Sequence, residues 1–141
     1  MDDANLIHQG SCHCGAVRFT VALPDHLSGT RCNCSICAMK GAVTVYAPLE
    51  DLTVTQGADT LSTYSFNSGV AKHHFCSSCG IHCFHQTRSM PDRYGINVAC
   101  LEGMSPFDFA EVLVVDGVNH PNDNGGLRRM AGMLRFEPAT G

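Results

Sequence analysis

The sequence predicts a single mainly β domain whose turns bind zinc, and three observations favour this class. The 141 residues suffice for one hydrophobic core but not for two comfortable domains. Short apolar segments with strand-like alternation follow one another, separated by Gly, Asn, Ser or Pro. Most of the nine cysteines fall into three tight groups. We therefore expect residues 1–141 to form one domain with metal sites in its turns.

The expected strands begin near residue 15. In residues 15–23, GAVRFTVAL, the larger apolar side chains occupy every second position, which is the period of a half-buried strand. Residues 41–57 contain β-branched runs that are broken by Pro48, which predicts two strands around a turn. Further short strands are expected in TLSTYSF (60–66), AKHHFC (71–76), IHCFHQT (81–87), YGINVAC (94–100) and FAEVLVVDG (109–117).

Two segments favour helix over strand. Residues 35–40 directly follow a cysteine-rich segment and are expected to form a helical turn. Residues 124–134, NGGLRRMAGML, are the second candidate for a short helix, although the glycines at positions 125 and 126 lower its helix propensity. The chain contains no internal repeat, low-complexity tract or linker, so the sequence does not divide the domain.

Charge and hydrophobicity argue against two classes of partner. The formal net charge is −4, and the basic and acidic residues are scattered along the chain. Without a basic stripe to bind phosphates, no nucleic-acid partner is expected. The N-terminus has neither the basic nor the apolar region of a signal peptide, and no apolar run reaches the length of a membrane span. We therefore expect a soluble, cytoplasmic protein that does not bind membranes.

The cysteine spacing indicates metal binding. An odd number of cysteines in a reducing cytoplasm argues against a disulfide framework. Short spacings let two thiolates from one turn reach the same ion at about 2.3 Å. The three groups are Cys12-x-Cys14, Cys32-x-Cys34-x-x-Cys37 and Cys76-x-x-Cys79. Three such groups in one small domain favour zinc over a redox or packing role.

The clustered cysteines divide most simply into a set of four and a set of three. Each two-cysteine group supplies half of a tetrahedral zinc site, so the two groups can close around one ion. This first set is Cys12, Cys14, Cys76 and Cys79. Such a site would connect distant parts of the chain, and its metal-binding energy would become folding energy. An alternative division combines Cys32 and Cys37 with the CxxC group and leaves the CxC group unused.

Cys32, Cys34 and Cys37 then remain as a site with three thiolates. Zinc prefers four ligands, and no fourth Cys or His follows nearby in the sequence. A distant protein ligand would close the site, and His74 is the candidate for that role. Water or a substrate in the fourth position would instead leave the site open for chemistry.

The remaining cysteines and histidines have simpler interpretations. Cys83 and Cys100 lie in apolar, strand-like segments, where a small thiol is expected to pack in the core. Several histidines flank the CxxC group, where four thiolates are already available as ligands. Most of them are therefore expected to contact the metal-binding cysteines without binding the metal, or to lie on the surface. These histidines are His73, His74, His82 and His85.

Three segments together resemble the glutathione-dependent formaldehyde-activating family, which includes relatives of centromere protein V. They are GSCHCGAVRF (10–19), RCNCSIC (31–37) and HHFCSSCGIHCFHQTRSMPDRYGINVACLEG (73–103). The resemblance extends to VVDGVNHP near residue 120, which includes His120. It implies an Mss4-like fold of two small antiparallel sheets with zinc-binding turns. It also implies a structural zinc on the set of four cysteines and a catalytic zinc with an open position on Cys32, Cys34 and Cys37.

The family resemblance implies a zinc-dependent carbon–sulfur lyase that acts on a glutathione–aldehyde adduct such as S-hydroxymethylglutathione, or on the adduct of another small thiol. A thiol that enters the open zinc position loses its proton and can add to an aldehyde such as formaldehyde. Glutathione also needs cations that bind its carboxylates. The candidates are Arg31, Lys40, Arg88 and Arg93.

Two other function classes remain open from the sequence. The first is a non-catalytic, zinc-stabilised binding module, although the acidic charge and the lack of a basic tail argue against chromatin binding. The second is a methionine sulfoxide reductase, which pairs two CxxC groups on one zinc and needs a separate reactive cysteine. Only Cys83 or Cys100 could serve as that cysteine, and neither sequence context is that of an activated thiol.

Overall fold

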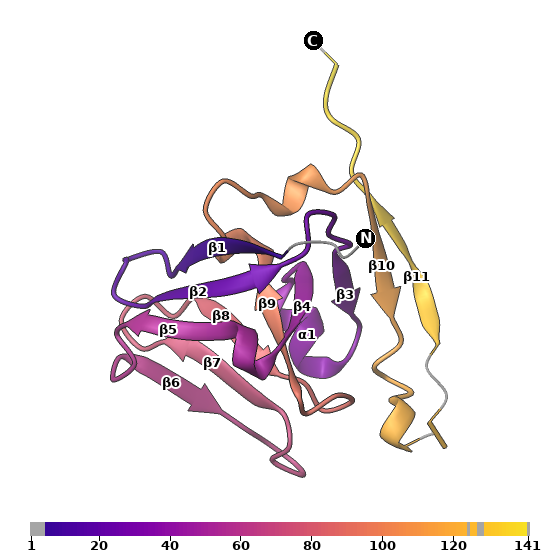
Figure 1. Ribbon diagram of the computed structural model, residues 1–141. Coiled ribbons are helices and arrows are strands. Elements are labelled where there is room, and N and C mark those ends of the chain that lie inside the picture. The colour runs from indigo at the N-terminus through magenta and orange to yellow at the C-terminus, as the bar shows by residue number, and fades with distance from the viewer. Residues whose placement is uncertain (1–4, 124, 127–128, 141) are drawn as a thin grey trace.

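The computed structural model describes residues 5–123, 125–126 and 129–140, whose strands form two sheets (Figure 1). The small sheet has the order β1-β2-β5, with β1 at Leu6–Ser11, β2 at Arg18–Leu23 and β5 at Leu52–Gln56. The larger sheet contains β3 (Thr30–Cys32), β4 (Thr44–Pro48), β6 (Leu61–Tyr64), β7 (Lys72–Cys76), β8 (His82–Gln86), β9 (Arg93–Asn97), β10 (Glu111–Val115) and β11 (Met130–Arg135). Its order is β11-β10-β3-β4-β9-β8-β7-β6. The predicted mainly β class is confirmed.

Helical structure in the described residues is limited to short turns. Helix α1 spans Ser35–Lys40, as the sequence predicts, and ends at Gly41. Gly41 has a φ of 66°, and its N–H donates to the carbonyl of Cys37, which is the usual left-handed end of a helix. Single 3-10 turns occur at η1 (Leu49–Asp51), η2 (Val98–Cys100), η3 (Pro106–Asp108) and η4 (Pro121–Asp123). None of the described helices is long and apolar enough to cross a membrane.

The prediction of a second helix in residues 124–134 is wrong for its C-terminal half. Residues 130–134 belong to β11, which pairs antiparallel with β10. The backbone upstream explains the difference, since Gly125 and Gly126 have φ values of 64° and 85°, outside the right-handed helical region. Residues 124, 127 and 128 of this prediction lie outside the described residues.

The strand predictions correspond to β2 and β4 to β10, whereas β1 and β3 were not singled out by the sequence patterns. β4 and β5 lie on either side of η1, as expected for two strands around a turn, but they belong to different sheets. The larger sheet is also mixed rather than purely antiparallel, because β3 and β10 run parallel.

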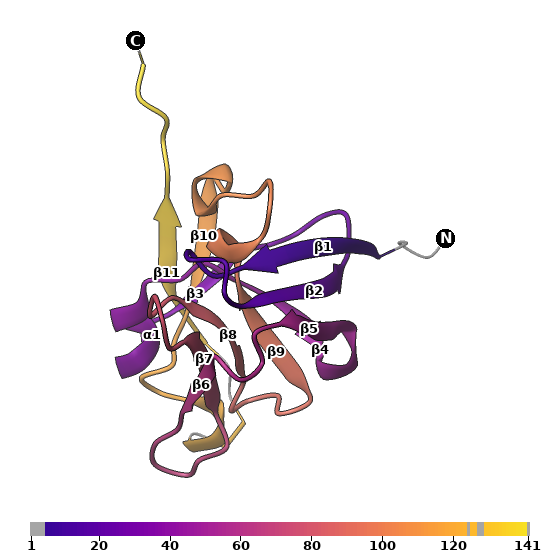
Figure 2. The same cartoon turned by 90° about the vertical axis from the view of Figure 1, so that its left-hand side faces the viewer.

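The core lies between the two sheets, which cross each other in the views of Figures 1 and 2. On β2, Phe19, Val21 and Leu23 are fully buried and alternate with partly exposed residues. The Phe19 ring meets the Phe84 ring of β8 edge to face, with centroids 5.3 Å apart. This contact joins the small sheet to the larger one.

The parallel pairing of β3 with β10 determines where the cysteine-rich segment lies. Val115 at the end of β10 is in register with Cys32 at the end of β3. The segments that follow the two strands therefore leave the sheet side by side. These segments are α1 on one side and residues 116–120 on the other.

We expect Phe19→Ala to lower the free energy of unfolding by about 3–5 kcal/mol, because it removes a fully buried ring from the contact between the sheets. The control is Phe107→Ala, since Phe107 is 66% exposed and should cost about 1 kcal/mol or less. Denaturant unfolding measures both. Equal losses for the two variants would contradict this account of the core.

Candidate metal centres

The structure brings the CxC and CxxC groups into one cluster, here called the four-cysteine cluster. Its members follow β1 or lie at and after the end of β7, and they are Cys12, Cys14, Cys76 and Cys79. Their Sγ atoms all lie within 4.8 Å of one another. The two cysteine pairs thus come together across the two sheets. This is the division of the cysteines that their spacing in the sequence favoured.

The sulfur separations fit a tetrahedral zinc ion. Sγ atoms at the corners of a tetrahedron with bonds of about 2.3 Å are about 3.8 Å apart. The Cys14 sulfur lies 3.6 Å from that of Cys12 and 3.7 Å from that of Cys76. Backbone N–H groups also point at the sulfurs: Val17 donates to Cys12 at 3.3 Å, and Ser78 donates to Cys76 at 3.3 Å. Such donors stabilise thiolates, so the residues present fit a bound zinc.

Cys32, Cys34 and Cys37 form a second group, here called the three-cysteine cluster, with all Sγ atoms within 4.8 Å. Cys32 ends β3, Cys34 is the N-cap of α1, and Cys37 lies inside that helix. Within the described residues, no further Cys, His, Asp or Glu has a ligand atom close enough to join this group. The alternative grouping of Cys32 and Cys37 with the CxxC pair is therefore not what the fold assembles.

Three sulfurs this close together cannot all carry a negative charge without a cation. Hydrogen bonds from Cys32 and Cys37 lower the pKa of the Cys34 thiol to about 2. The same contacts, with Cys32 and Cys34, raise the pKa of the Cys37 thiol. A bound divalent ion would remove this competition, because it attracts all three thiolates. The donor set is the soft, sulfur-rich type that suits zinc.

The segment after β10 covers the three-cysteine cluster, and sequence reasoning did not identify the residues that hold it there. Asn33 lies between two of the cysteines, and its Oδ1 accepts hydrogen bonds from the N–H groups of Gly117, at 2.7 Å, and Val118, at 3.1 Å. A Cβ on Gly117 would overlap the Cys32 sulfur and lie 2.9 Å from the Cys34 Cβ. Glycine is required at this position because the backbone passes directly over the cluster.

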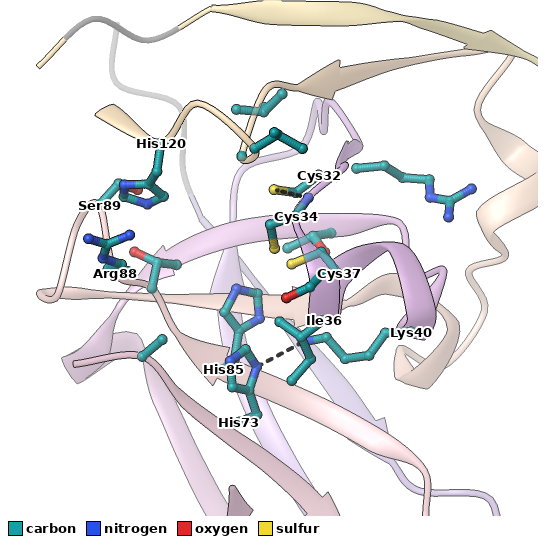
Figure 3. A pocket seen from close by; sticks show the side chains of 18 of the residues that line it. Cys32, Cys34, Ile36, Cys37, Lys40, His73, His85, Arg88, Ser89 and His120 are labelled. Atoms are coloured by element: carbon teal, nitrogen blue, oxygen red, sulfur yellow. Dashed lines mark hydrogen bonds between the residues drawn. The ribbon is translucent and has the colours of Figure 1, made fainter. Parts of the chain in front are cut away.

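A cavity of about 430 Å³ opens beside the three-cysteine cluster (Figure 3). All three cysteines line it. Its walls come from β3, α1, the β6–β7 and β8–β9 loops and the segment after β10. They include the apolar residues Ile36, Phe66, Met90 and Val118. A concave space that combines apolar surface with converging polar and charged side chains fits a small-molecule site.

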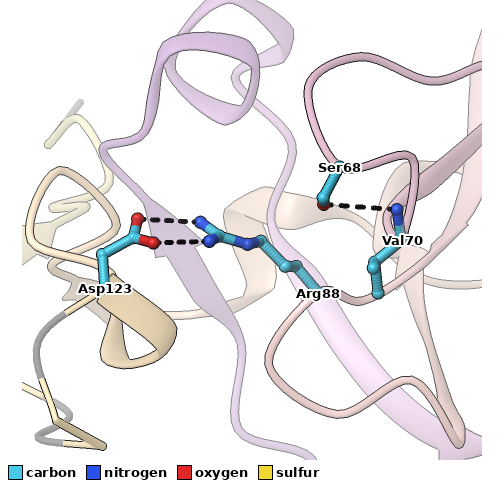
Figure 4. A network of polar contacts seen from close by, with 4 residues as sticks. All are labelled: Ser68, Val70, Arg88 and Asp123. Atoms are coloured by element: carbon cyan, nitrogen blue, oxygen red, sulfur yellow. Dashed lines mark hydrogen bonds and ion pairs between the residues drawn. The ribbon is translucent and has the colours of Figure 1, made fainter.

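The four predicted cations occupy different environments. Arg31, Lys40 and Arg88 line the cavity, whereas Arg93 does not and instead pairs with Pro48 across β9 and β4. Arg88 forms a two-pronged ion pair with Asp123, at 2.6 and 3.0 Å, which raises the pKa of the guanidinium (Figure 4). The ion pair joins the β8–β9 loop to η4 at the rim of the cavity.

The predicted histidines also separate into groups. His73, His85 and His120 line the cavity. His74, the candidate for a fourth ligand, is not among the lining residues and instead makes a 2.9 Å hydrogen bond with Thr63 Oγ1. The structure therefore does not bring His74 to the three-cysteine cluster. The fourth position stays a prediction.

Cys83 and Cys100 are 0% and 7% exposed and pack in the core, where the sequence placed them. Interactions with Cys100 and burial raise the pKa of the Cys83 thiol. This buried thiol is unlike the exposed, activated cysteine that a reductase needs.

Comparison with known proteins identifies the group to which the chain is related. The family model of the glutathione-dependent formaldehyde-activating enzyme matches residues 7–112, most of the chain. The chain belongs to this family. The matched region includes both cysteine clusters and ends at the start of β10.

Two similar proteins show how much of the chain the similarity covers. A curated relative from Halomonas elongata, whose name assigns it to the formaldehyde-activating family, is 38% identical over 82 residues. The alignment covers 52% of this chain and 52% of the relative, so the chain spans about half the length of that relative. A crystal structure of a Rhodobacter sphaeroides protein has a TM-score of 0.71 at 48% identity, covering 74% of this chain and 96% of that one. These matches support the family and its fold.

The four-cysteine cluster should be required for folding in this family member. We expect Cys79→Ser to lose the zinc of that cluster and much of the cooperative thermal transition, because three close thiolates would share an under-coordinated ion. Zinc content and a thermal melt measure the effect, with Cys100→Ala as a control thiol outside both clusters. A Cys79→Ser protein that keeps its full zinc content and melts like the parent would contradict the division of the cysteines into these two clusters.

Gly117→Ala should disturb the three-cysteine cluster selectively, because the added Cβ meets Cys32 and Cys34. We expect zinc at that cluster to be lost more readily while the four-cysteine cluster keeps its metal. Gly132→Ala is the matched control, since a Cβ at Gly132 meets nothing within 4 Å. Zinc per chain during graded chelation separates the two outcomes, and equal retention in both variants would count against the close approach seen here.

Proposed function

We propose that this chain is a zinc-dependent carbon–sulfur lyase that acts on the adduct of glutathione, or another small thiol, with formaldehyde. The observation that carries the proposal is the position of the three-cysteine cluster in the wall of a cavity of about 430 Å³. Membership of the glutathione-dependent formaldehyde-activating family supports the same substrates. We propose two zinc ions per chain, a structural ion on the four-cysteine cluster and a catalytic ion beside the cavity.

The two clusters differ in the way that structural and catalytic zinc sites differ. Four protein ligands close a tetrahedral site, whereas three leave a position that water or substrate can occupy. The four-cysteine cluster has four protein ligands, whereas the three-cysteine cluster has three and forms part of the cavity wall. When zinc is bound there, it supplies a positive charge that favours the thiolate form of a substrate thiol.

The proposed reaction balances without any further reactant. In the direction of adduct formation, the sulfur electron pair forms a bond to the formaldehyde carbon, and the carbonyl π pair moves to oxygen. The oxygen then takes up a proton equivalent to the one that the thiol released. The reverse reaction breaks the carbon–sulfur bond and returns the same proton. No electrons are gained or lost overall, so the cavity needs no redox cofactor for this step.

The walls of the cavity have two tasks in this proposal. Apolar side chains such as Ile36, Phe66 and Met90 exclude water around the sulfur and strengthen electrostatic interactions there. Arg31 lies beside Cys32 on β3 and is the best-placed cation for a substrate carboxylate. Arg88 is committed to Asp123, so its contribution is to hold the rim of the cavity.

Cys34→Ser should abolish the activity while leaving the protein folded, because the four-cysteine cluster that joins the sheets stays intact. We expect the variant to hold one zinc instead of two, and to lose the catalysed exchange between glutathione, formaldehyde and their adduct. The exchange also runs without a catalyst, so the measured quantity is the increment over a zinc-free blank.

A Cys34→Ser protein that unfolds would assign the three-cysteine zinc a structural role instead. A zinc-loaded parent with no increment for any small thiol would contradict the lyase proposal and favour a non-catalytic binding module.

A further inference from the structure

Lys40 is a half-buried cation in an unusual setting. It is the last residue of α1, and its Nζ lies 3.0 Å from Nδ1 of His73 on β7 and 3.3 Å from Nε2 of His82 on β8. The two ion pairs found among the described residues are Arg88–Asp123 and Arg135–Glu111. Within that part of the chain, the Lys40 ammonium therefore has no carboxylate partner.

The two histidines orient the ammonium but do not balance its charge. A lysine ammonium can only donate hydrogen bonds, so Nδ1 of His73 and Nε2 of His82 are acceptors, and both rings are neutral. Burial lowers the pKa of His73 to about 4 and that of His82 to about 2, consistent with neutral rings. A positive charge that is partly withdrawn from water and lies between two neutral groups is stabilised when a negative charge lies close to it.

The three-cysteine cluster is the negative group within reach. Cys37 precedes Lys40 by one helical turn, so the two side chains leave the same face of α1, and both line the cavity (Figure 3). Three thiolates around one divalent zinc leave about one net negative charge. Burial lowers the pKa of Lys40, and the charges of Cys37, Cys34 and Cys32 oppose that shift.

We propose that Lys40 is a positioning residue that supplies a fixed countercharge to the three-cysteine cluster. Its ammonium offsets the negative charge of the thiolates and so strengthens zinc binding there. The same charge also favours binding of the substrate thiolate at the open zinc position. This second part of the inference rests on the proposed function. His73 and His82 hold the ammonium in place.

This assignment differs from the role that the sequence alone gave to Lys40. A cation that binds a substrate carboxylate should present its N–H groups to the open cavity. Lys40 lines the cavity but directs two of its N–H groups to His73 and His82. Its charge acts on the metal ligands, and Arg31 remains for the substrate.

Lys40→Gln tests the charge separately from the hydrogen bonds, because an amide still donates to a histidine but is neutral. The full-length, zinc-loaded protein is challenged with graded chelator while zinc per chain is measured. We expect zinc at the three-cysteine cluster to be bound about 10- to 100-fold more weakly than in the parent, as for loss of other groups that support metal ligands. Zinc at the four-cysteine cluster and the thermal melt should stay near the parent's.

Two further variants make the test specific. Lys72→Gln removes an exposed lysine of β7 whose Nζ donates to the Gly69 carbonyl, and it should retain zinc like the parent. Lys40→Arg keeps the charge and should recover part of the affinity. Lys40→Gln that holds zinc as tightly as Lys72→Gln would overturn the proposal. So would Lys40→Gln and Lys40→Arg variants that lose zinc equally, because charge would then make no difference.

Enzyme kinetics test whether Lys40 favours binding of the substrate thiol. If the lyase proposal holds, Lys40→Gln should raise KM for the thiol more than it lowers kcat, because the lost charge favours thiolate binding. If the parent shows no activity with any thiol, the lyase proposal fails, while the chelation experiment still decides the role of Lys40.

Discussion

The structure depends on one constraint, which is the meeting of four sulfurs from two distant turns. Cys12 and Cys14 follow the first strand of the small sheet, whereas Cys76 and Cys79 belong to the larger sheet. Two sheets of this size share a modest core, and the contact between Phe19 and Phe84 is its centre. A metal bound by the cluster would add its binding energy to folding and fix the small sheet over the larger one. The three-cysteine cluster and its cavity would then not be needed to stabilise the fold.

This separation of tasks explains why the two clusters differ in their surroundings. The four-cysteine cluster receives N–H donors from its own turns. The three-cysteine cluster also depends on a distant segment, because Asn33 holds Gly117 over it. Lys40, at the end of the same helix as Cys37, is held by histidines of two other strands. In our proposal, zinc on three thiolates keeps a net negative charge, and the Lys40 ammonium, fixed by hydrogen bonds to two histidines, offsets it.

Much of this arrangement could be predicted from the sequence because it is local. Alternation predicted β2, and the CxC, CxCxxC and CxxC spacings predicted which sulfurs share a turn. The features that the sequence did not reveal depend on long-range pairing. Met130–Arg135 was predicted as part of a helix but is a strand because β10 offers it a partner, which its own composition does not reveal. No sequence pattern indicates that two histidines from β7 and β8 reach the Nζ of Lys40. Gly117 fell at the end of an expected strand, residues 109–117, and no sequence pattern indicated its close approach to the cysteines.

The parallel pairing of β3 with β10 has a consequence for synthesis of the chain. Thr30 pairs with Leu113, and Asn33 bonds to Val118, so the cover of the three-cysteine cluster comes from a segment more than eighty residues later. Contacts at such separation form slowly, because a long loop must close first. On the ribosome, Cys32, Cys34 and Cys37 emerge long before residue 118 and remain open to solvent during that interval. Metal can reach these thiolates while the chain is still growing, and so can oxidants, which makes the order of these encounters part of how the protein matures.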